Sequence, residues 1–361
     1  MTLRVPYSLT LALAALAVTL MATPVTMSIA RRSGALDRPG PRRIHDRPVP
    51  TLGGLALALA VLGVMWLGYA LPGPARQLDS HPLRGLTLAS LVMLALGVVD
   101  DLRRLSPWAK LGGQALAALV LAGFGFGIPA LTNPFGGQLV TGVYNLPLTV
   151  AWVLIVTNAI NLIDGLDGLA SGVVLITSVT LWYVGRTHSD FYVMFLTAPL
   201  IGATLGFLRF NFPPARVFMG DTGSQFLGLL MAAVSLVENR KGTATITLLL
   251  PLVAMGLPIA DSVIALTRRL THRQPPLRGD SGHIHHRLLR LGFSPRSALI
   301  VLWYLCAYLG VMAAVLAALP RHYGWVFLLL FAAGLLFAFE LIEFIDRTRG
   351  ERGPPSWPPR A

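Results

Sequence analysis

Long apolar stretches alternate with short polar segments along most of this chain. An α-helix needs about 20 predominantly apolar residues to cross the roughly 30 Å hydrocarbon core of a membrane, and many of these stretches approach that length. The pattern predicts an all-α polytopic membrane protein with about eleven transmembrane helices. We place these spans at 7–30, 51–71, 85–99, 108–128, 144–160, 169–186, 191–208, 223–237, 244–267, 297–318 and 323–345. Residues 1–346 are expected to form a single transmembrane bundle, followed by a short Pro/Arg-rich tail at 347–361.

The composition excludes an ordinary soluble domain, because 12% of the residues are charged and soluble domains carry about 25%. The net charge of +13 does not indicate nucleic-acid binding, since the basic residues lie between the apolar spans. With the N-terminus outside, 22 of the 29 Lys and Arg residues fall in cytoplasmic segments and 7 in outside segments. This bias predicts an outside N-terminus and a cytoplasmic C-terminus.

Two further features bear on how the chain is processed. A cleaved signal peptide within 7–30 is the competing interpretation of the N-terminus, and it would place the Arg-rich segment 31–47 outside. The single Cys306 lies in an apolar span, so neither a disulfide framework nor a cysteine-based metal site can form within one chain.

The acids, amides and histidines gather in loops that this topology places in the cytoplasm. Ionisable groups near lipid are energetically costly and usually functional, so a shared site at that face explains the asymmetry. By the same topology, 42–50 and 278–290 are cytoplasmic and 130–142 lie outside. The motif-rich segments are 42–54, 100–110, 158–172, 211–224 and 278–294.

One of these segments carries acids and amides at every third residue, namely Asn158, Asn161, Asp164 and Asp167. On a continuous helix such residues form a polar stripe with i, i+3 neighbours in contact. Gly165 and Gly168 favour a loosening of the helix there, which would let backbone N–H groups reach a ligand.

Asp221 lies between two glycines just before an apolar span. It is interpreted either as a turn with a capping side chain or as a hard-cation ligand beside a helix N-terminus, where phosphate also binds. The histidine cluster His283, His285 and His286 suits anionic phosphate better than zinc, because cysteine ligands are absent and arginines surround the cluster. An oxygen-rich site favours Mg²⁺ or Mn²⁺ bound together with a diphosphate, and hence metal-dependent phosphoryl transfer.

The motifs together resemble the polyprenyl-phosphate N-acetylhexosamine-1-phosphate transferases over roughly residues 35 to 300. The resemblance rests on ordered elements, which are RIHDRPVPTLGG (43–54), DDLRRLSPWAKLGGQ (100–114), NAINLIDGLDGLASG (158–172), VFMGDTGS (217–224), PIADS (258–262) and HIHHRLLRLG (283–292). It is similar to the N-acetylglucosamine-type branch, whereas the related phospho-MurNAc-pentapeptide transferases typically carry a run of consecutive histidines.

The resemblance implies roles for particular residues. Asp221 is implied as the principal Mg²⁺ ligand with Asn161 beside it, and Mn²⁺ as a substitute metal. Asp100 is implied to accept a proton from the lipid phosphate or to orient it, and a covalent aspartyl-phosphate intermediate is the rival mechanism. The remaining catalytic residues are implied to be Asp101, Lys110, Asp164 and Asp167, and the remaining substrate-binding residues His45, Asn158, His283, His285, His286 and Arg287.

The implied reaction transfers N-acetylglucosamine-1-phosphate from UDP-N-acetylglucosamine to undecaprenyl phosphate and releases UMP, which would start a cell-envelope glycan at the cytoplasmic membrane. The implied partners are undecaprenyl phosphate, a UDP-N-acetylhexosamine and membrane lipid, with no nucleic acid, and a homodimer stays open. Another UDP-N-acetylhexosamine or UDP-MurNAc-pentapeptide is the alternative donor. A transporter with a cation site is the alternative class, but it predicts polar residues near span centres.

Overall fold

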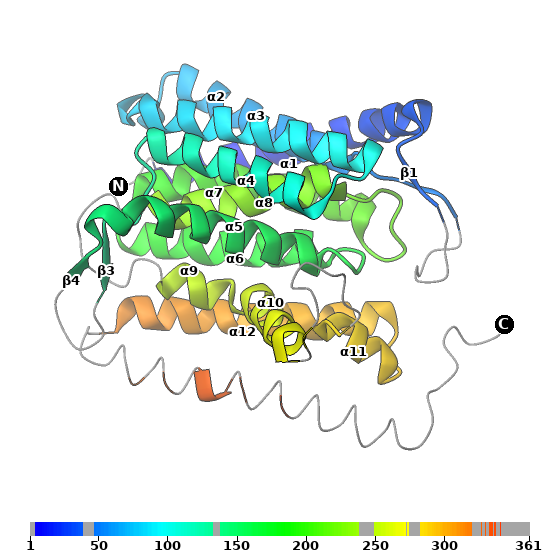
Figure 1. Ribbon diagram of the computed structural model, residues 1–361. Coiled ribbons are helices and arrows are strands. Elements are labelled where there is room, and N and C mark those ends of the chain that lie inside the picture. The colour runs from blue at the N-terminus through cyan, green and yellow to red at the C-terminus, as the bar shows by residue number, and fades with distance from the viewer. Residues whose placement is uncertain are drawn as a thin grey trace.

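The structure is a computed structural model that describes residues 4–38, 47–132, 138–237, 249–271, 273 and 282–319, with a few further residues between 326 and 340. Most of the helices lie side by side with their long axes roughly parallel (Figure 1). The helices are α1 (Arg4–Ser33), α2 (Gly53–Ala70), α3 (Ser80–Arg103), α4 (Pro107–Gly123), α5 (Asn145–Ile163), α6 (Leu169–Thr187), α7 (Phe191–Asn211), α8 (Gly220–Val237), α9 (Leu249–Ala254), α10 (Gly256–Thr271), α11 (Ile284–Arg290) and α12 (Pro295–Ala318).

Two short antiparallel hairpins connect helices of the bundle. Strands β1 (Leu36–Asp37) and β2 (Val49–Pro50) pair between α1 and α2, and β3 (Ala130–Thr132) pairs with β4 (Gln138–Val140) between α4 and α5. Single 3₁₀ turns precede α3 and α5, at Pro74–Gln77 and Gly142–Tyr144.

The apolar pattern is confirmed as that of a polytopic membrane protein. Among the described residues, seven helices are long and apolar enough to cross a membrane, and they are α1, α2, α3, α5 with its preceding turn, α6, α7 and α12. The span placed at 85–99 is part of the 24-residue helix α3. The spans placed at 108–128 and 223–237 appear as α4 and α8, of 17 and 18 residues.

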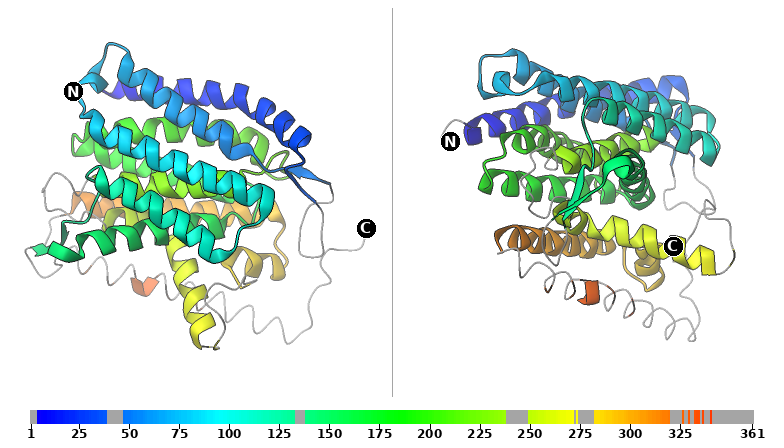
Figure 2. Two further views of the ribbon diagram at one scale, coloured as in Figure 1. Left: turned by 45° about the horizontal axis from the view of Figure 1, so that its top comes forward. Right: turned by 60° about the vertical axis from the view of Figure 1, so that its left-hand side comes forward.

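The prediction of one continuous span over 244–267 is wrong. The chain turns at Met255 and divides this segment into α9 and α10. Figure 2 (left) shows α10 leaving the bundle at a steep angle to α12. Asp261, Arg268 and Arg269 give α10 a polar face, which explains why it does not continue as an apolar span. The span placed at 323–345 lies mostly outside the described residues, as does the tail at 347–361.

Polar residues at the ends of apolar runs start several helices. Side chains of Asp79, Ser106, Asp190 and Ser294 each accept a hydrogen bond from a backbone N–H in the first turn of α3, α4, α7 and α12. Such caps satisfy N–H groups that have no partner inside the helix, and they fix where a loop ends and the next helix begins.

Small residues let the helices that carry the motif segments pack backbone to backbone. A methyl group added at Gly54 of α2 would lie 2.2 Å from the backbone nitrogen of Gly223 in α8. One added at Gly97 of α3 would lie 2.4 Å from Cα of Thr222. The start of α8 is therefore held between α2 and α3, whose other contacts belong to one continuous apolar core.

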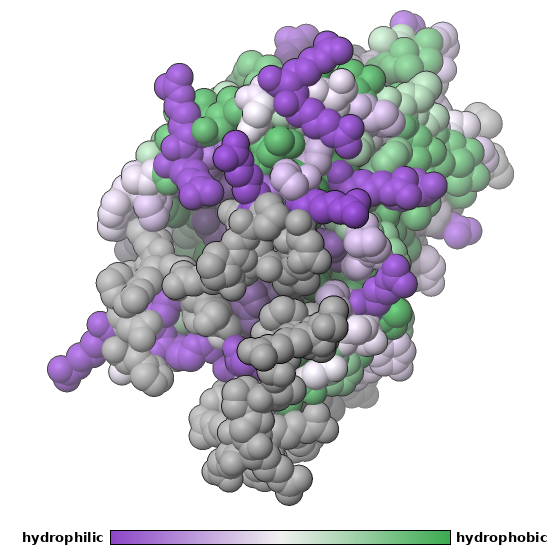
Figure 3. Space-filling view, turned by 90° about the vertical axis from the view of Figure 1, so that its right-hand side faces the viewer, coloured by the Kyte–Doolittle hydropathy of each residue, from purple (hydrophilic) through white to green (hydrophobic). Residues whose placement is uncertain are grey.

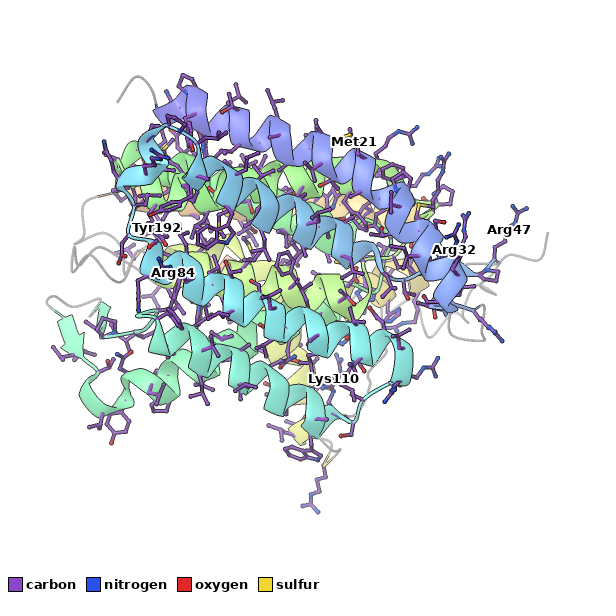
Figure 4. The ribbon with its side chains drawn as sticks, turned by 90° about the horizontal axis from the view of Figure 1, so that it is seen from above. Met21, Arg32, Arg47, Arg84, Lys110 and Tyr192 are labelled. Carbon is purple, nitrogen blue, oxygen red and sulfur yellow. The ribbon has the colours of Figure 1, made fainter. Side chains whose placement is uncertain are left out.

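The two ends of the bundle differ in character. In Figure 4, Arg32 and Arg47 lie at the end of the bundle nearer to Lys110, and Arg84 and Tyr192 lie at the opposite end. Figure 3 looks onto the first of these ends, where hydrophilic side chains gather and the flanks beyond them are largely hydrophobic. The acids, amides and histidines of the motif segments meet at this end.

Candidate active site

A cavity of about 630 Å³ opens among the motif segments. Its wall combines carboxylates and amides with apolar residues and a basic edge, a composition suited to a ligand that has both charged and flat apolar parts. The side chains and loops that line it are Asp37, Thr51, Asp101, Asn161, Asp164, Gly165, Leu166, Asp167, Asn211, Pro213, Pro214, Ala215, Phe218, Gly220, Asp221, His286, Ser294, Pro295 and Arg296.

The Asp221 carboxylate is the point where three helices converge. Its Oδ1 accepts hydrogen bonds from Nζ of Lys110 at 3.2 Å and from Nδ2 of Asn161 at 3.1 Å. Gln225, one turn further along α8, donates to the same oxygen at 3.3 Å. Ser224 in turn donates to Oδ1 of Asn161 at 2.9 Å, which orients the Asn161 amide group toward Asp221. The predicted neighbours Asp221 and Asn161 are therefore in direct contact.

Asp101 caps the N-terminus of α8. Its Oδ1 accepts from the backbone N–H of Asp221 at 2.8 Å, and its Oδ2 accepts from the N–H and the hydroxyl of Thr222 at 3.1 and 2.6 Å. Gly220 has a φ of +70°, and a side chain there would meet both Thr51 and Asp101. The segment forms a turn before α8, but the capping acid is Asp101 of α3 and not an Asp or Ser of the segment itself.

Asp100 lies behind the cavity wall and is 3% exposed. Its Oδ1 accepts from the backbone N–H of Leu105 at 2.7 Å, in a turn where Arg104 ends α3 with a left-handed backbone. Its Oδ2 forms an ion pair with Lys110, and the side chain of Lys110 is 27% exposed. Asp100 thus reaches the site through Lys110, which bridges it to Asp221.

The loop 164–168 begins where α5 ends at Ile163, so the expected loosening of the helix at the two glycines is confirmed. Gly168 adopts a φ of +75° and starts α6. The buried Asn211 holds this loop, because its Oδ1 accepts from the N–H of Gly168 at 3.1 Å. Asp167 accepts from the N–H of Ala215 at 2.9 Å and so joins the loop to the segment after α7.

Asp164 lies among other carboxylates. Burial raises the pKa of its carboxyl well above the ordinary value, and the charges of Asp221, Asp167 and Asp101 raise it further. Such mutual repulsion is what a bound cation would relieve.

The histidine segment packs onto this loop through α11. His285 is 1% exposed, and a methyl group added at Gly165 would lie 2.5 Å from its Nε2. Burial lowers the pKa of His285 to about 3, with His286 adding to the effect, so the ring is neutral. His286 lines the cavity beside it, with ring centroids 4.2 Å apart.

Asp261 of α10 anchors the start of α11. Its Oδ2 lies 2.8 Å from Nδ1 of His283, and its Oδ1 accepts from the N–H of Ile284 at 3.0 Å. Asp261 and His283 are both buried. Arg287 donates from Nε to the carbonyl of Gly282 at 3.1 Å, which braces the same turn. The histidine segment therefore depends on α10 for its position.

In the part of the chain that the structure describes, four predicted substrate-binding residues do not line the cavity, namely Asn158, His283, His285 and Arg287. Asn158 donates from Nδ2 to Oε1 of Gln114 at 2.7 Å, in a partly buried amide pair between α4 and α5. His45 lies outside the described residues, in the segment between β1 and β2. Asp37 and Thr51, which flank that hairpin, both line the cavity.

The donor set fits a magnesium ion that shares its ligands with a substrate. Within the described ranges no group of three His, Cys, Asp or Glu side chains could hold a metal by itself. Mg²⁺ is commonly bound by one or two carboxylates together with substrate phosphates, so a cage of three protein ligands is not required. Asp221 and the repelling carboxylate of Asp164 supply oxygen donors of the right kind, while Asn161 turns its amide nitrogen to Asp221 and its oxygen to Ser224.

Several residues that build the site were not assigned a role from the sequence. Gln225 and Asp261 contact assigned residues, while Asn211 and Arg296 line the cavity. Asn211 begins the motif-rich segment 211–224, and a polar residue directly before a Phe-Pro-Pro segment was the available signal. Nothing in the local sequence of α12 marks Arg296, because its place depends on how α12 packs.

Known proteins similar to this chain point to one family. Residues 83–239 match the family described as Glycosyl transferase family 4. A protein of Bacillus subtilis (strain 168) named as a probable undecaprenyl-phosphate N-acetylglucosaminyl 1-phosphate transferase is 36% identical over 303 residues, covering 82% of this chain and 81% of its own. The decaprenyl-phosphate N-acetylglucosaminephosphotransferase of Mycolicibacterium smegmatis is 35% identical over 316 residues, covering 81% and 78%. The undecaprenyl-phosphate alpha-N-acetylglucosaminyl 1-phosphate transferase of Escherichia coli (strain K12) is 28% identical over 341 residues, covering 89% of each chain.

The helical bundle is that of a multi-pass membrane protein, and the similarity to these relatives makes the chain a glycosyl-1-phosphate transferase. The chain belongs to Glycosyl transferase family 4, and the resemblance seen in its motifs is confirmed.

Proposed function

We propose that this chain transfers N-acetylglucosamine-1-phosphate from UDP-N-acetylglucosamine to a polyprenyl phosphate, with undecaprenyl phosphate as the carrier, and releases UMP. The observation that carries the proposal is the convergence of Lys110, Asn161 and Gln225 on one oxygen of Asp221 beside a cavity with further carboxylates. The names of the relatives support the sugar, and they include both undecaprenyl and decaprenyl carriers.

The reaction forms a bond between an oxygen of the lipid phosphate and the β-phosphorus of the donor. The bond between that phosphorus and the oxygen bridging to the α-phosphate breaks, and UMP leaves. Phosphoryl transfer demands alignment and neutralisation of charge more than covalent chemistry from the protein. Lys110 supplies a positive charge at Asp221, and Asn161 holds the Asp221 carboxylate in place.

Magnesium is the proposed cofactor, with manganese as a substitute. When bound at Asp221 and Asn161, it would neutralise the negative charge that develops on the diphosphate. The cap from Asp101 fixes the first turn of α8 and with it the position of Asp221. His286 at the cavity wall is proposed to contact the sugar or diphosphate, with His285 held neutral behind it.

Asp100 is proposed to orient the lipid phosphate through Lys110, or to accept its proton. A pH–rate profile of Asp100→Asn separates the two roles, because the second pKa of a phosphate monoester is about 6. A base role predicts that the variant recovers as pH rises, whereas orientation through Lys110 predicts a constant deficit. A burst of one UMP per enzyme without lipid acceptor would instead indicate a covalent aspartyl phosphate.

The site is proposed to face the cytoplasm. The basic residues counted along the chain favour this orientation, and Arg32 and Arg47 lie at the end of the bundle where the motif segments meet (Figure 4). A nucleotide sugar made in the cytoplasm would then reach the cavity directly.

The experiment that tests the proposal is a thin-layer assay of purified protein with undecaprenyl phosphate and a panel of radiolabelled UDP-sugars. UDP-N-acetylglucosamine should yield a labelled lipid and an equal amount of UMP. Transfer from UDP-N-acetylgalactosamine or UDP-MurNAc-pentapeptide alone would replace the donor, and no lipid product from any of them would contradict the proposed reaction. Repeating the assay with decaprenyl phosphate tests the choice of carrier.

A further inference from the structure

The wall of the cavity is unevenly charged. Five carboxylates line it, from Asp37, Asp101, Asp164, Asp167 and Asp221. Arg296 is the one Lys or Arg side chain among the described residues that line it. A cavity so rich in carboxylates repels a nucleotide diphosphate, so a permanent positive charge on its wall has a clear electrostatic use.

Arg296 is held in a defined position at this wall. It lies in the first turn of α12, which begins at Pro295 behind the capping side chain of Ser294. Its Nε donates to the carbonyl of Pro213 at 3.1 Å. Within the described ranges this is the one hydrogen bond that Arg296 makes, and a guanidinium has five N–H donors. The two terminal nitrogens therefore keep their donors for a ligand.

The segment 213–217, which holds Arg296, is itself fixed by further hydrogen bonds. Asp167 accepts from the N–H of Ala215, and Asn211 donates to the carbonyl of Val217 at 2.9 Å. Arg296 thus belongs to the wall formed by α12 and the segment after α7. The cation at Asp221 is Lys110 of α4, which contacts that carboxylate but does not itself line the cavity. The site therefore presents two separate cations to a ligand with two charged parts.

We propose that Arg296 binds the nucleotide half of the donor, the part that leaves as UMP. This inference rests on the proposed function, which assigns the transferred phosphate and the lipid phosphate to Asp221 and the neighbouring Lys110. The oxygen acceptors of a nucleotide are its α-phosphate and its pyrimidine carbonyls, and a guanidinium donates to either. The cavity also has apolar lining from Leu166, Phe218 and Pro213, the residue that Arg296 contacts, and such a surface suits the flat face of a base.

Steady-state kinetics of Arg296→Lys and Arg296→Ala test this role. Hydrogen bonds to charged groups contribute about 1.5–3 kcal/mol, so Arg296→Ala should raise KM for UDP-N-acetylglucosamine and Ki for UMP about tenfold or more. Arg296→Lys should fall between Arg296→Ala and the wild type. We expect kcat to change by less than about threefold and KM for undecaprenyl phosphate to stay constant, the pattern of lost ground-state binding.

Arg209→Ala is the matched control, since Arg209 is an exposed arginine at the end of α7 that does not line the cavity. It should leave all four constants unchanged. Thermal unfolding of each variant checks that the 213–217 segment still folds, and Arg296→Lys keeps the test informative if Arg296→Ala is destabilised.

Inhibition by uridine identifies which oxygens Arg296 contacts. A Ki for uridine that rises together with the Ki for UMP places the contact at the base, and an unchanged Ki for uridine places it at the phosphate. Unchanged values of KM for the donor and Ki for UMP in both variants would overturn the inference. If the wild type transfers nothing from UDP-N-acetylglucosamine, the proposed function fails instead. Calorimetric binding of UMP to the wild type and to Arg296→Ala then tests Arg296 alone.

Discussion

At the scale of single residues, the site depends on carboxylates whose partners come from distant parts of the chain. Asp101 and Asp221 both line the cavity, but their carboxylates have different structural roles. Asp101 accepts three hydrogen bonds from the start of α8, and Asp221 accepts from three side chains that approach it from α4, α5 and α8. Replacing either acid therefore changes a network rather than one contact.

Gly165 provides a test of how closely the histidine segment packs. Gly165→Ala would place a methyl group 2.5 Å from Nε2 of the buried His285, which must move and displace His286 from the cavity. Misplacing a group at a reaction site by about 1 Å can cost up to 10²-fold in rate, so we expect activity to fall by about tenfold or more. The measurement is the initial rate of lipid-linked sugar formation.

Gly63→Ala is the control for this prediction, because nothing lies within 4 Å of a methyl group added in that position of α2. It should leave the rate unchanged. Wild-type activity in Gly165→Ala would show that His285 and His286 have more freedom than the packing implies.

At the scale of elements, the fold shows which parts of the site the sequence could predict. The closeness of Asn161 to Asp221 was expected from the family resemblance, whereas the contact of Lys110 with Asp221 was not, because Lys110 was assigned to a substrate phosphate. The break at Met255 was not expected, because residues 244–260 are predominantly apolar and Asp261 alone did not divide the segment. Asp100 was expected at the reacting phosphates, yet its side chain is buried behind Lys110, a depth that no local pattern encodes.

The anchoring of α11 by α10 leads to a prediction at this scale. Asp261→Leu removes the acceptor for His283 and for the N–H of Ile284, and leaving buried donors unpaired costs about 1–3 kcal/mol each. We expect transfer to fall at least tenfold, with partial rescue in Asp261→Asn, whose side-chain oxygen can still accept one of the two bonds. Rates and thermal unfolding are measured for both variants.

Ser262→Ala is the neighbouring control, since the buried hydroxyl of Ser262 has no hydrogen-bond partner in the part of the chain that the structure describes. Its activity should match the wild type. Full activity in Asp261→Leu would show that α11 holds its place without α10.

At the scale of the whole molecule, orientation in the membrane decides whether the site can receive its donor. In a variant without Cys306, we predict that Val140→Cys is labelled in intact cells by a maleimide that cannot cross the membrane. Val140 is 81% exposed in the hairpin at one end, and Arg290 is exposed on α11 near the site. Arg290→Cys should be labelled only after the cells are opened. Labelling of Arg290→Cys in intact cells would show that the protein has the opposite orientation in the membrane.

The central claim is a metal-dependent transfer centred on Asp221, and one assay tests it most directly. Purified protein is given UDP-N-acetylglucosamine and undecaprenyl phosphate, first in EDTA and then with Mg²⁺ or Mn²⁺ restored, and Asp221→Asn is assayed beside it. We predict no lipid product in EDTA and full recovery with metal. Asp221→Asn should lose activity by about 10²-fold or more, since a catalytic metal contributes several kcal/mol and each 1.4 kcal/mol is about tenfold. Undiminished transfer in excess EDTA, or wild-type activity in Asp221→Asn, would contradict the account.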